Sequence, residues 1–213
     1  MEREIEYLKI VLKMLSNLIV HTGGCLVALD LRCGSSWLTR RIARLCSLVV
    51  GIDVKASSEW TKSRHPNLEF IVADARSLPL RPNAVYFVVA ISLLEHVLGW
   101  DKVIPEVHHV LRRRGLFVVQ LPSLTYIIEP HTKLPLLGLL PRRLRAMLVS
   151  SVGYKDLQFS RKLRNVAKEL ERHGFKYWVS SYHYILRSSL LLSQPFLIMA
   201  IKMFEAIKEY AKR

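Results

Sequence analysis

Three carboxylates stand at the ends of short apolar runs within the first 74 residues of this 213-residue sequence, where a charged side chain has no packing role. They are Asp30 in the run Cys25–Leu31, Asp53 directly after Leu48–Ile52, and Asp74 shortly after Leu68–Val72. If these runs are neighbouring parallel strands, their carboxyl ends meet at the edge where open α/β sheets bind ligands. We therefore expect the three acids to form a cradle for a ligand that carries hydroxyl or amino groups.

The turn after the first run, Arg32-Cys33-Gly34-Ser35-Ser36, favours a cationic nucleoside without phosphates. Asp53 lies about 20 residues beyond Gly34, where an acid can accept hydrogen bonds from ribose hydroxyls. Asp74 could accept one from an exocyclic amine such as that of adenine. A nicotinamide dinucleotide would need a GxGxxG turn whose N–H groups bind a pyrophosphate, and this turn has one glycine beside an acid.

Apolar runs and helical segments alternate from residue 25 to residue 121. The runs are Cys25–Leu31, Leu48–Ile52, Leu68–Val72, Ala84–Ile91 and Leu116–Leu121, and the helical segments are Trp37–Cys46, Ala56–Ser63 and Lys102–Leu111. Near-continuous runs rich in Val and Ile are typical of strands buried on both faces. The alternation predicts an α/β fold with a parallel sheet between helices.

The remaining residues are expected to complete a single domain, residues 1–213. Residues 1–24 predict an amphipathic helix, 122–160 an inserted lid, Arg161–His173 a helix, Phe175–His183 and Pro195–Met203 two strands, and 204–213 a charged helix. A helix on a membrane surface is the competing interpretation of Ile185–Phe204. The whole pattern predicts a Rossmann-like, doubly wound, mostly parallel seven-stranded sheet with helices on both faces and a lid after strand five.

The charge balance favours a polyanionic neighbour. Lys and Arg number 32 against 17 Asp and Glu, which gives a net charge of +15 and a pI near 10.0. Basic residues gather in Arg112–Arg114 and between Arg142 and Lys168. RNA and an anionic membrane surface are both candidate partners, and a solvated basic face is the plain alternative.

The three cysteines, Cys25, Cys33 and Cys46, are odd in number and include no CxxC pair. Neither a disulfide framework nor a zinc site is expected, and no metal is implied. The acidic N-terminus is unlike a signal peptide, and no run of about 20 apolar residues lacks polar interruptions. We expect a cytoplasmic protein, with a peripheral membrane location as the alternative.

Four motifs, in the same order along the chain, resemble those of class I S-adenosylmethionine-dependent methyltransferases of the type 11 group. This group includes ubiquinone- and menaquinone-biosynthesis enzymes. Ala28–Ser36 is similar to the family's glycine-rich first motif, Gly51–Asp53 to its ribose-binding acid, Asp74-Ala75 to its adenine-recognising pair, and Ser92–Val97 to the segment after strand four. The resemblance implies S-adenosyl-L-methionine as cofactor. It assigns the cofactor contacts to Asp30, Arg32, Cys33, Gly34, Asp53, Val54, Asp74, Ala75 and Ser92.

The first motif departs from the family's pattern, because two of its three glycine positions hold Arg32 and Ser36. A non-glycine residue in left-handed geometry costs roughly 1–2 kcal/mol, which a cofactor site tolerates. The side chain of Arg32 has two interpretations: it binds the methionine carboxylate, or it fills the space of the cofactor.

The resemblance implies methyl transfer to an unidentified acceptor, for which a small or lipid-like molecule is the leading hypothesis. Holding the acceptor in line supplies most of the rate of such a transfer. His96 is the candidate base for an acceptor that must lose a proton, and Glu129 and His131 in the lid are candidate acceptor contacts. The alternatives are an RNA methyltransferase and a non-catalytic binding protein whose site Arg32 and Ser36 have closed.

Overall fold

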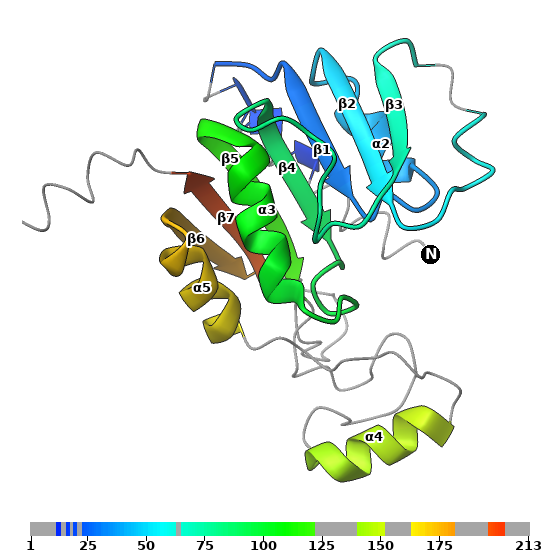
Figure 1. The fold of residues 1–213 in the computed structure, drawn as a ribbon, viewed down its shortest axis with the longest axis vertical. Helices are drawn as coiled ribbons and strands as arrows, with labels where there is room; N and C mark the ends of the chain where they lie inside the picture. The colour runs from blue at the N-terminus through cyan, green and yellow to red at the C-terminus, as the bar shows by residue number, and fades with distance from the viewer. Residues whose placement is uncertain are drawn as a thin grey trace, which may run out of the picture.

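A seven-stranded sheet forms the centre of the computed structural model, which describes residues 12–13, 16–17, 19–20, 23–62, 65–121, 140–151, 163–181 and 196–202 (Figure 1). In chain order the elements are β1 (Val27–Leu31), α2 (Trp37–Ile42), β2 (Leu48–Asp53), β3 (Leu68–Val72), β4 (Val85–Ile91), the 3₁₀ helix η1 (Trp100–Lys102), α3 (Val103–Val110), β5 (Leu111–Leu121), α4 (Arg142–Ser151), α5 (Leu163–Arg172), β6 (Phe175–Ser181) and β7 (Phe196–Lys202). The strands lie in the order β3-β2-β1-β4-β5-β7-β6.

The first five strands are parallel, and β7 runs antiparallel between β5 and β6. The strand order reverses between β1 and β4, so the loops that leave these two strands turn in opposite directions. Such a reversal leaves a crevice at the carboxyl edge of the sheet, where doubly wound folds bind their ligands. The mostly parallel, doubly wound sheet is the fold that the sequence predicts.

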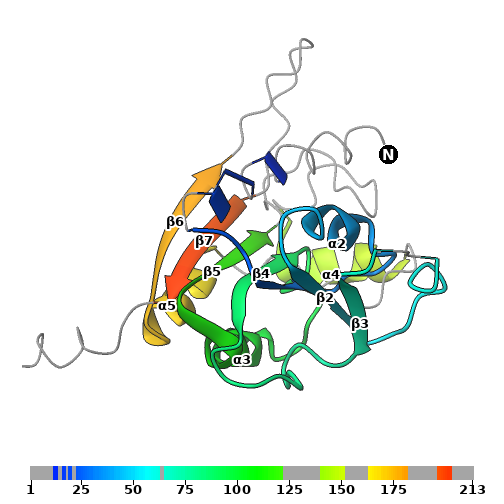
Figure 2. The ribbon, with the colours of Figure 1, turned by 90° about the horizontal axis from the view of Figure 1, so that it is seen from above.

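Helices cover both faces of the sheet, because successive strand residues point to opposite sides. Along β4, Phe87 and Val89 belong to the core under α2, whereas Val88 and Ala90 belong to the core under α3 and α5. Figure 2 shows α2 on one side of the sheet and α3 with α5 on the other. Leu38 and Ile42 carry the contact of α2. The two apolar cores fix the strand ends, and with them the loops at the carboxyl edge.

Lys202 joins the antiparallel strand to the rest of the fold. Its side chain is buried, and its Nζ donates to the side-chain oxygen of Asn83 and to the main-chain oxygens of His108 and Leu111 at 2.7–2.9 Å. The last two oxygens lie at the carboxyl end of α3, where a cation also interacts favourably with the helix dipole. The contact sets the end of β7 against α3.

Most of the predicted elements are confirmed within a few residues, but the helix predicted at Ala56–Ser63 is wrong. Residues 58–62 form turns instead. The amide of Glu59 donates to the hydroxyl oxygen of Ser57, and the hydroxyl of Thr61 donates to the main-chain oxygen of Ser58. Hydroxyl side chains that bind the nearby backbone compete with helical hydrogen bonds, which explains the error. The fifth strand is also longer than predicted, since it begins at Leu111 rather than Leu116.

The expectation that the cysteines form no disulfide is wrong as well. Cys25, just before β1, is bonded to Cys46, just after α2, across 21 sequence positions, and Cys33 is a buried free thiol. The return of the chain through α2 to the start of β2 brings the two residues together, which neither their number nor their spacing reveals. Closing this loop stabilises the fold by restricting the unfolded chain.

Some predictions fall partly or wholly outside the described residues. The C-terminal helix at 204–213 lies outside them, as do most of the apolar segment 185–204 and much of the lid. The part of the lid that is described contains α4, and the described pairs within residues 12–20 are helical, as expected of the N-terminal segment. Among the helices that the structure describes, none has the length and apolar character to cross a bilayer.

Candidate functional site

The turn between β1 and α2 has an unusual backbone. Arg32, Gly34 and Ser36 all have positive φ, at 66°, 49° and 65°. This left-handed region favours glycine, and non-glycine residues held there concentrate at functional sites. A Cβ added to Gly34 would meet no atom within 4 Å, so the turn borders open space on that side. The chain therefore keeps a strained turn that leaves room for a ligand against its backbone.

Asp53 at the end of β2 holds this turn in place. The amide of Gly34 donates to Asp53 Oδ2 at 3.0 Å, and the amide of Lys55 donates to Asp53 Oδ1 at 3.3 Å. The amides of Arg32 and Cys33 both donate to the main-chain oxygen of Ile52. The carboxylate is half-buried and keeps lone pairs for a ligand, because each carboxylate oxygen can accept more than one hydrogen bond.

Asp30, in β1, is almost inaccessible, with 2% of its surface exposed. The hydroxyl of Thr39 on α2 donates to Asp30 Oδ2 at 2.7 Å. Burial raises the pKa of Asp30 to about 7; the Thr39 hydrogen bond opposes this rise, and the charge of Asp53 adds to it. Asp30 is thus held by α2 and nearly closed to solvent. Burial likewise raises the pKa of Cys33, which keeps this residue a neutral thiol.

Asp74, after β3, is paired with Arg76. The Arg76 Nε lies 3.0 Å from both carboxylate oxygens, and its Nη2 donates to Oδ2. The hydrogen bonds from Arg76 hold the pKa of Asp74 below its ordinary value, so this carboxyl is ionised at neutral pH.

The two residues next to these acids differ in exposure. Ala75 is buried, whereas 63% of the surface of Val54 is exposed beside Asp53. The amide of Ala73 donates to the main-chain oxygen of Asp53 at 2.9 Å, so Asp53 and Asp74 stand at adjoining strand ends.

Ser92, after β4, has a φ of 51° and faces the turn from the other side of the strand-order reversal. Its amide and hydroxyl both donate to the side-chain oxygen of the buried Gln120, at 2.9 and 2.8 Å. The main-chain oxygen of Ser92 accepts a hydrogen bond from Arg32 Nη1 at 2.9 Å. The side chain of Arg32 therefore crosses the crevice between β1 and β4.

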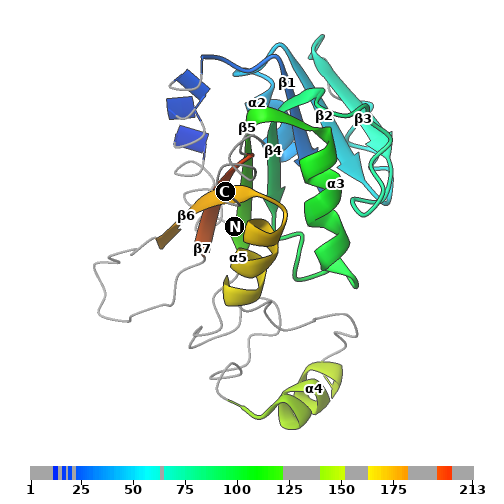
Figure 3. The same ribbon diagram turned by 60° about the vertical axis from the view of Figure 1, so that its left-hand side comes forward.

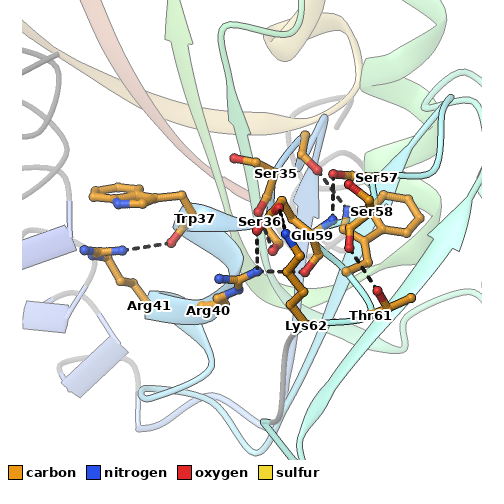
Figure 4. Close-up of polar contacts among 12 residues, drawn as sticks. Ser35, Ser36, Trp37, Arg40, Arg41, Ser57, Ser58, Glu59, Thr61 and Lys62 are labelled. Carbon is orange, nitrogen blue, oxygen red and sulfur yellow. Dashed lines mark hydrogen bonds and ion pairs between the residues drawn. The ribbon is translucent and has the colours of Figure 1, made fainter.

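A loop over residues 57–62 borders the site on the β2 side (Figure 4). The guanidinium of Arg40 on α2 donates to the main-chain oxygen of Glu59 at 2.8 Å, and Lys62 pairs with the carboxylate of Glu59 at 2.6 Å. Within the loop, the indole N–H of Trp60 donates to the main-chain oxygen of Gly34 at 2.8 Å. Trp60 thus binds the turn from the β2–β3 loop, whereas Arg32 connects the turn to Ser92 after β4.

The ring of Trp60 stacks on Phe70 of β3, with centroids 4.8 Å apart and planes 7° from parallel. A Cβ on Gly51 would lie 2.7 Å from the Phe70 ring and 3.0 Å from the Cys33 sulfur. Glycine at this position is therefore required for the close packing of β2, Phe70 and the turn. The stack ties the loop, the turn and two strands together.

The candidate residues for catalysis and acceptor contact are His96, Glu129 and His131. His96 is half-buried in a turn after β4, where its amide donates to the main-chain oxygen of Leu93 at 2.9 Å. Glu129 and His131 lie outside the described residues. His108 and His109 lie in α3 as predicted, and the ring of His108 meets Phe175 edge-on at 5.4 Å.

Sequence reasoning missed three contacts of this site: Trp60, Arg76 and Gln120. The motif Asp74-Ala75-Arg76 carried a signal for the second, because an arginine two residues after an acid in a turn can reach it. Trp60 was missed because it lies within the segment that was incorrectly predicted as a helix. Gln120, a lone amide within an apolar strand, was visible as a buried polar residue that requires a partner.

Comparisons with known proteins find similarity to methyltransferases. A family described as a methyltransferase domain matches residues 29–119, a range that begins within β1 and ends within β5. A probable S-adenosylmethionine-dependent methyltransferase of Mycobacterium tuberculosis is 29% identical over 96 residues. These residues are 45% of this chain and 35% of that protein, so the chain covers well under two thirds of this relative's length.

Two solved structures show the same fold at low sequence identity. The 1,6-didemethyltoxoflavin-N1-methyltransferase of Burkholderia thailandensis, solved with 1,6-didemethyltoxoflavin and S-adenosylhomocysteine, is 16% identical, with a TM-score of 0.63 over 91% of this chain and 78% of that one. A putative S-adenosylmethionine-dependent methyltransferase from Listeria monocytogenes is 17% identical, with a TM-score of 0.66 over 84% of this chain and 92% of that one. The chain is therefore similar, in the sequence of residues 29–119 and in its fold, to S-adenosylmethionine-dependent methyltransferases.

The turn after β1 lacks two of the glycines of the methyltransferase motif that it resembles, but it keeps a left-handed backbone at both positions. Arg32 and Ser36 stand where the superfamily commonly has glycine, and both adopt the left-handed conformation that glycine adopts readily. The side chain of Ser36 is buried and its hydroxyl donates to the main-chain oxygen of Ser35. The left-handed turn therefore forms without glycine at two of these positions.

Proposed function

We propose that this chain is a methyltransferase that binds S-adenosyl-L-methionine at the carboxyl edge of β1 to β4 and methylates a small or lipid-like acceptor. The observation that carries the proposal is the order of polar groups along that edge: Asp74 after β3, Asp53 at the end of β2, and Arg32 between β1 and β4. This order matches the order of adenine, ribose and methionine along the cofactor.

Each group suits the part of the cofactor that it would hold. Asp53 would accept hydrogen bonds from the ribose hydroxyls, and Asp74 would accept one from the adenine amine. The exposed Val54 would lie against the apolar face of the base. Arg32 uses Nη1 for Ser92, and its other N–H groups are available as donors to a carboxylate. The open space above Gly34 leaves room for the ligand.

S-adenosylmethionine supplies a methyl group on a sulfonium sulfur that is already activated for transfer. The residues of the chain therefore need to orient two molecules and exclude water, and effective molarity can contribute about 7–11 kcal/mol to such a reaction. His96 would take a proton from an acceptor that has to lose one. Cys33 contributes only main-chain contacts, since burial raises the pKa of its thiol.

Two exposed apolar side chains, Leu98 and Val54, border the proposed adenine site. Leu98, after β4, is 69% exposed, and its main-chain oxygen accepts a hydrogen bond from Arg76 Nη1 at 2.9 Å, which places it beside Asp74. Val54, which follows Asp53, is a second exposed apolar side chain at this end of the site. RNA remains the alternative acceptor, since the chain carries a net charge of +15.

Calorimetry and thermal shift with S-adenosylhomocysteine test the cofactor assignment. We expect millimolar ligand to stabilise the protein, because binding to the native state alone raises the free energy of unfolding. Asp53→Ala should abolish binding, and Asp53→Asn keeps an acceptor for the Gly34 amide and so separates ligand contact from loss of the turn. Asp101→Ala, an exposed acid in η1, is the matched control.

Two results would contradict the proposal. Absence of stabilisation by S-adenosylhomocysteine would indicate a methyltransferase-like scaffold that does not bind the cofactor. Binding of RNA with a steep dependence on salt, together with methylation of that RNA, would replace the small or lipid-like acceptor by a nucleic acid. A flat response of RNA binding to salt would remove the RNA alternative.

A further inference from the structure

Helix α4 combines basic residues with an apolar stripe. Its ten residues, RRLRAMLVSS, include three arginines, at positions 142, 143 and 145, and no acid. Leu144, Met147 and Leu148 follow one another at steps of three and one, so they share a face of the helix. A helix with this composition is typical of peptides that lie in a membrane surface.

The apolar stripe is exposed in the folded chain. The exposed fractions are 50% for Leu144, 69% for Met147 and 41% for Leu148, and Arg143 is exposed beside them. A surface helix that packs on its own domain buries such a stripe, as α3 does with Val103, Val107 and Val110. In α4 these side chains are available to another apolar phase.

The position of α4 relates it to the proposed site. Figures 1 and 3 show α4 beyond the edge of the sheet to which β1 to β4 point, well separated from α3 and α5. The cofactor residues proposed above occupy that same edge. A surface that binds α4 would therefore lie on the same side of the molecule as the proposed cofactor site.

The positive charge of α4 indicates which kind of partner it would bind. Three arginines without a compensating acid favour an anionic partner, and the whole chain has a net charge of +15. RNA would satisfy the arginines but not Leu144, Met147 and Leu148, because phosphates offer no apolar phase. An anionic bilayer satisfies both, since arginine can keep its guanidinium at the headgroups while its stem lies along apolar groups.

We propose that α4 lies in the surface of an anionic lipid bilayer and brings the carboxyl edge of the sheet to that surface. Ten residues make a helix about 15 Å long, which suits binding parallel to the membrane and not across it. The proposal extends the proposed function, because it accounts for the access of a lipid-like acceptor, but lipid binding by α4 requires no cofactor.

Co-sedimentation of the full chain with vesicles tests the proposal. We expect binding to vesicles of phosphatidylcholine and phosphatidylglycerol in equal amounts, and weak binding to phosphatidylcholine alone. Arg143→Glu and Met147→Glu should each weaken binding by about tenfold or more, because each removes one of the two attractions. Arg81→Glu and Leu26→Glu make the same changes at exposed positions before β4 and β1, at the opposite edge of the sheet, and should leave binding within about twofold.

A label on the helix distinguishes insertion from general attraction. Met147→Cys offers the reactive thiol, since Cys33 is buried and Cys25 is bonded to Cys46. A polarity-sensitive dye at this position should shift to shorter wavelength with anionic vesicles and be quenched by lipids that carry a quencher in the acyl chain. Unchanged binding of S-adenosylhomocysteine by all the variants would show that they fold and that the cofactor site is separate.

Three outcomes would overturn the proposal. The first is a lack of binding to anionic vesicles, and the second is an equal loss in the α4 variants and their controls. The third is that Arg143→Glu abolishes binding of a single-stranded RNA and leaves vesicle binding unchanged, which would assign α4 to RNA. Failure of cofactor binding with intact vesicle binding would contradict the proposed function alone.

Discussion

The guanidinium of Arg32 donates to the main-chain oxygen of Ser92 over 2.9 Å, and so connects the carboxyl ends of β1 and β4. Both residues have positive φ, at 66° and 51°. Two strained residues that meet across the reversal of strand order indicate a site whose geometry is held for function. The contact also leaves the remaining guanidinium donors beside the place proposed for the methionine end of the cofactor.

Arg32→Ala separates the two roles that the sequence leaves open. If Arg32 binds the carboxylate, the variant should bind S-adenosylhomocysteine about tenfold to a hundredfold more weakly, because hydrogen bonds to charged groups contribute about 1.5–3 kcal/mol. Methylthioadenosine, which lacks the carboxylate, should bind both proteins equally. Calorimetry measures the four affinities. Tighter binding of S-adenosylhomocysteine by the variant would show instead that Arg32 obstructs the site.

Trp60→Phe tests the hydrogen bond that supports the turn. Phenylalanine can still stack on Phe70 but cannot donate to the main-chain oxygen of Gly34. We expect the dissociation constant of S-adenosylhomocysteine to rise by about 2- to 10-fold, the effect of one net hydrogen bond. Trp178→Phe, on the exposed part of β6, is the control. Equal affinities of the two variants would exclude a role for the indole N–H.

Asp30→Asn should change the dependence of stability on pH. The native pKa of Asp30 is about 7 against an ordinary 3.8, so between these values the native state holds a proton that the unfolded chain releases. Stability from this group therefore falls as the pH rises from about 4 to 7, and is lowest above 7. Asparagine removes the effect, so the advantage of the variant should grow over that range, as measured by urea unfolding at each pH. A constant difference would contradict burial of an ionisable Asp30, and Asp101→Asn controls for surface charge.

Lys202→Met should destabilise the fold strongly. The substitution keeps an apolar stem but leaves Asn83 and the main-chain oxygens of His108 and Leu111 without the buried ammonium that binds them. We expect a loss of about 2–4 kcal/mol in the free energy of unfolding, since breaking buried charged contacts is costly. Lys176→Met, on exposed β6, should cost little. Similar denaturation midpoints for the two variants would refute the role given to Lys202.

The strands were predictable because their residues satisfy local and tertiary preferences at once. Runs such as Leu48–Ile52 are apolar on both faces, and only a strand between two helical layers buries both. The positions of Asp53 and Asp74 followed from the same logic, since the chain leaves a buried strand at the ligand edge. For these elements the pattern of side chains carries the information.

Other features depend on contacts that no local pattern encodes. The left-handed backbone of Arg32 and Ser36 is imposed by the strand ends around it. The residue types at these positions do not favour that conformation and so do not predict it. The start of β5 carries Arg112–Arg114, whose charges conceal a strand that bulges where Arg114 has a φ of 60°. There the guanidinium of Arg112 lies over the ring of Tyr86, a contact that requires the pairing with β4 to be known.

The bond between Cys25 and Cys46 encloses β1, the turn and α2 in one covalent ring. If the molecule were pulled by its ends, the 21 sequence steps within that ring would carry no tension. Complete extension of the oxidised chain should thus fall short of the reduced chain by about 70 Å, a difference that optical tweezers resolve. The segment between Cys25 and Cys46, which contains the turn next to the proposed ligand, would bear no force even after the whole sheet had unfolded.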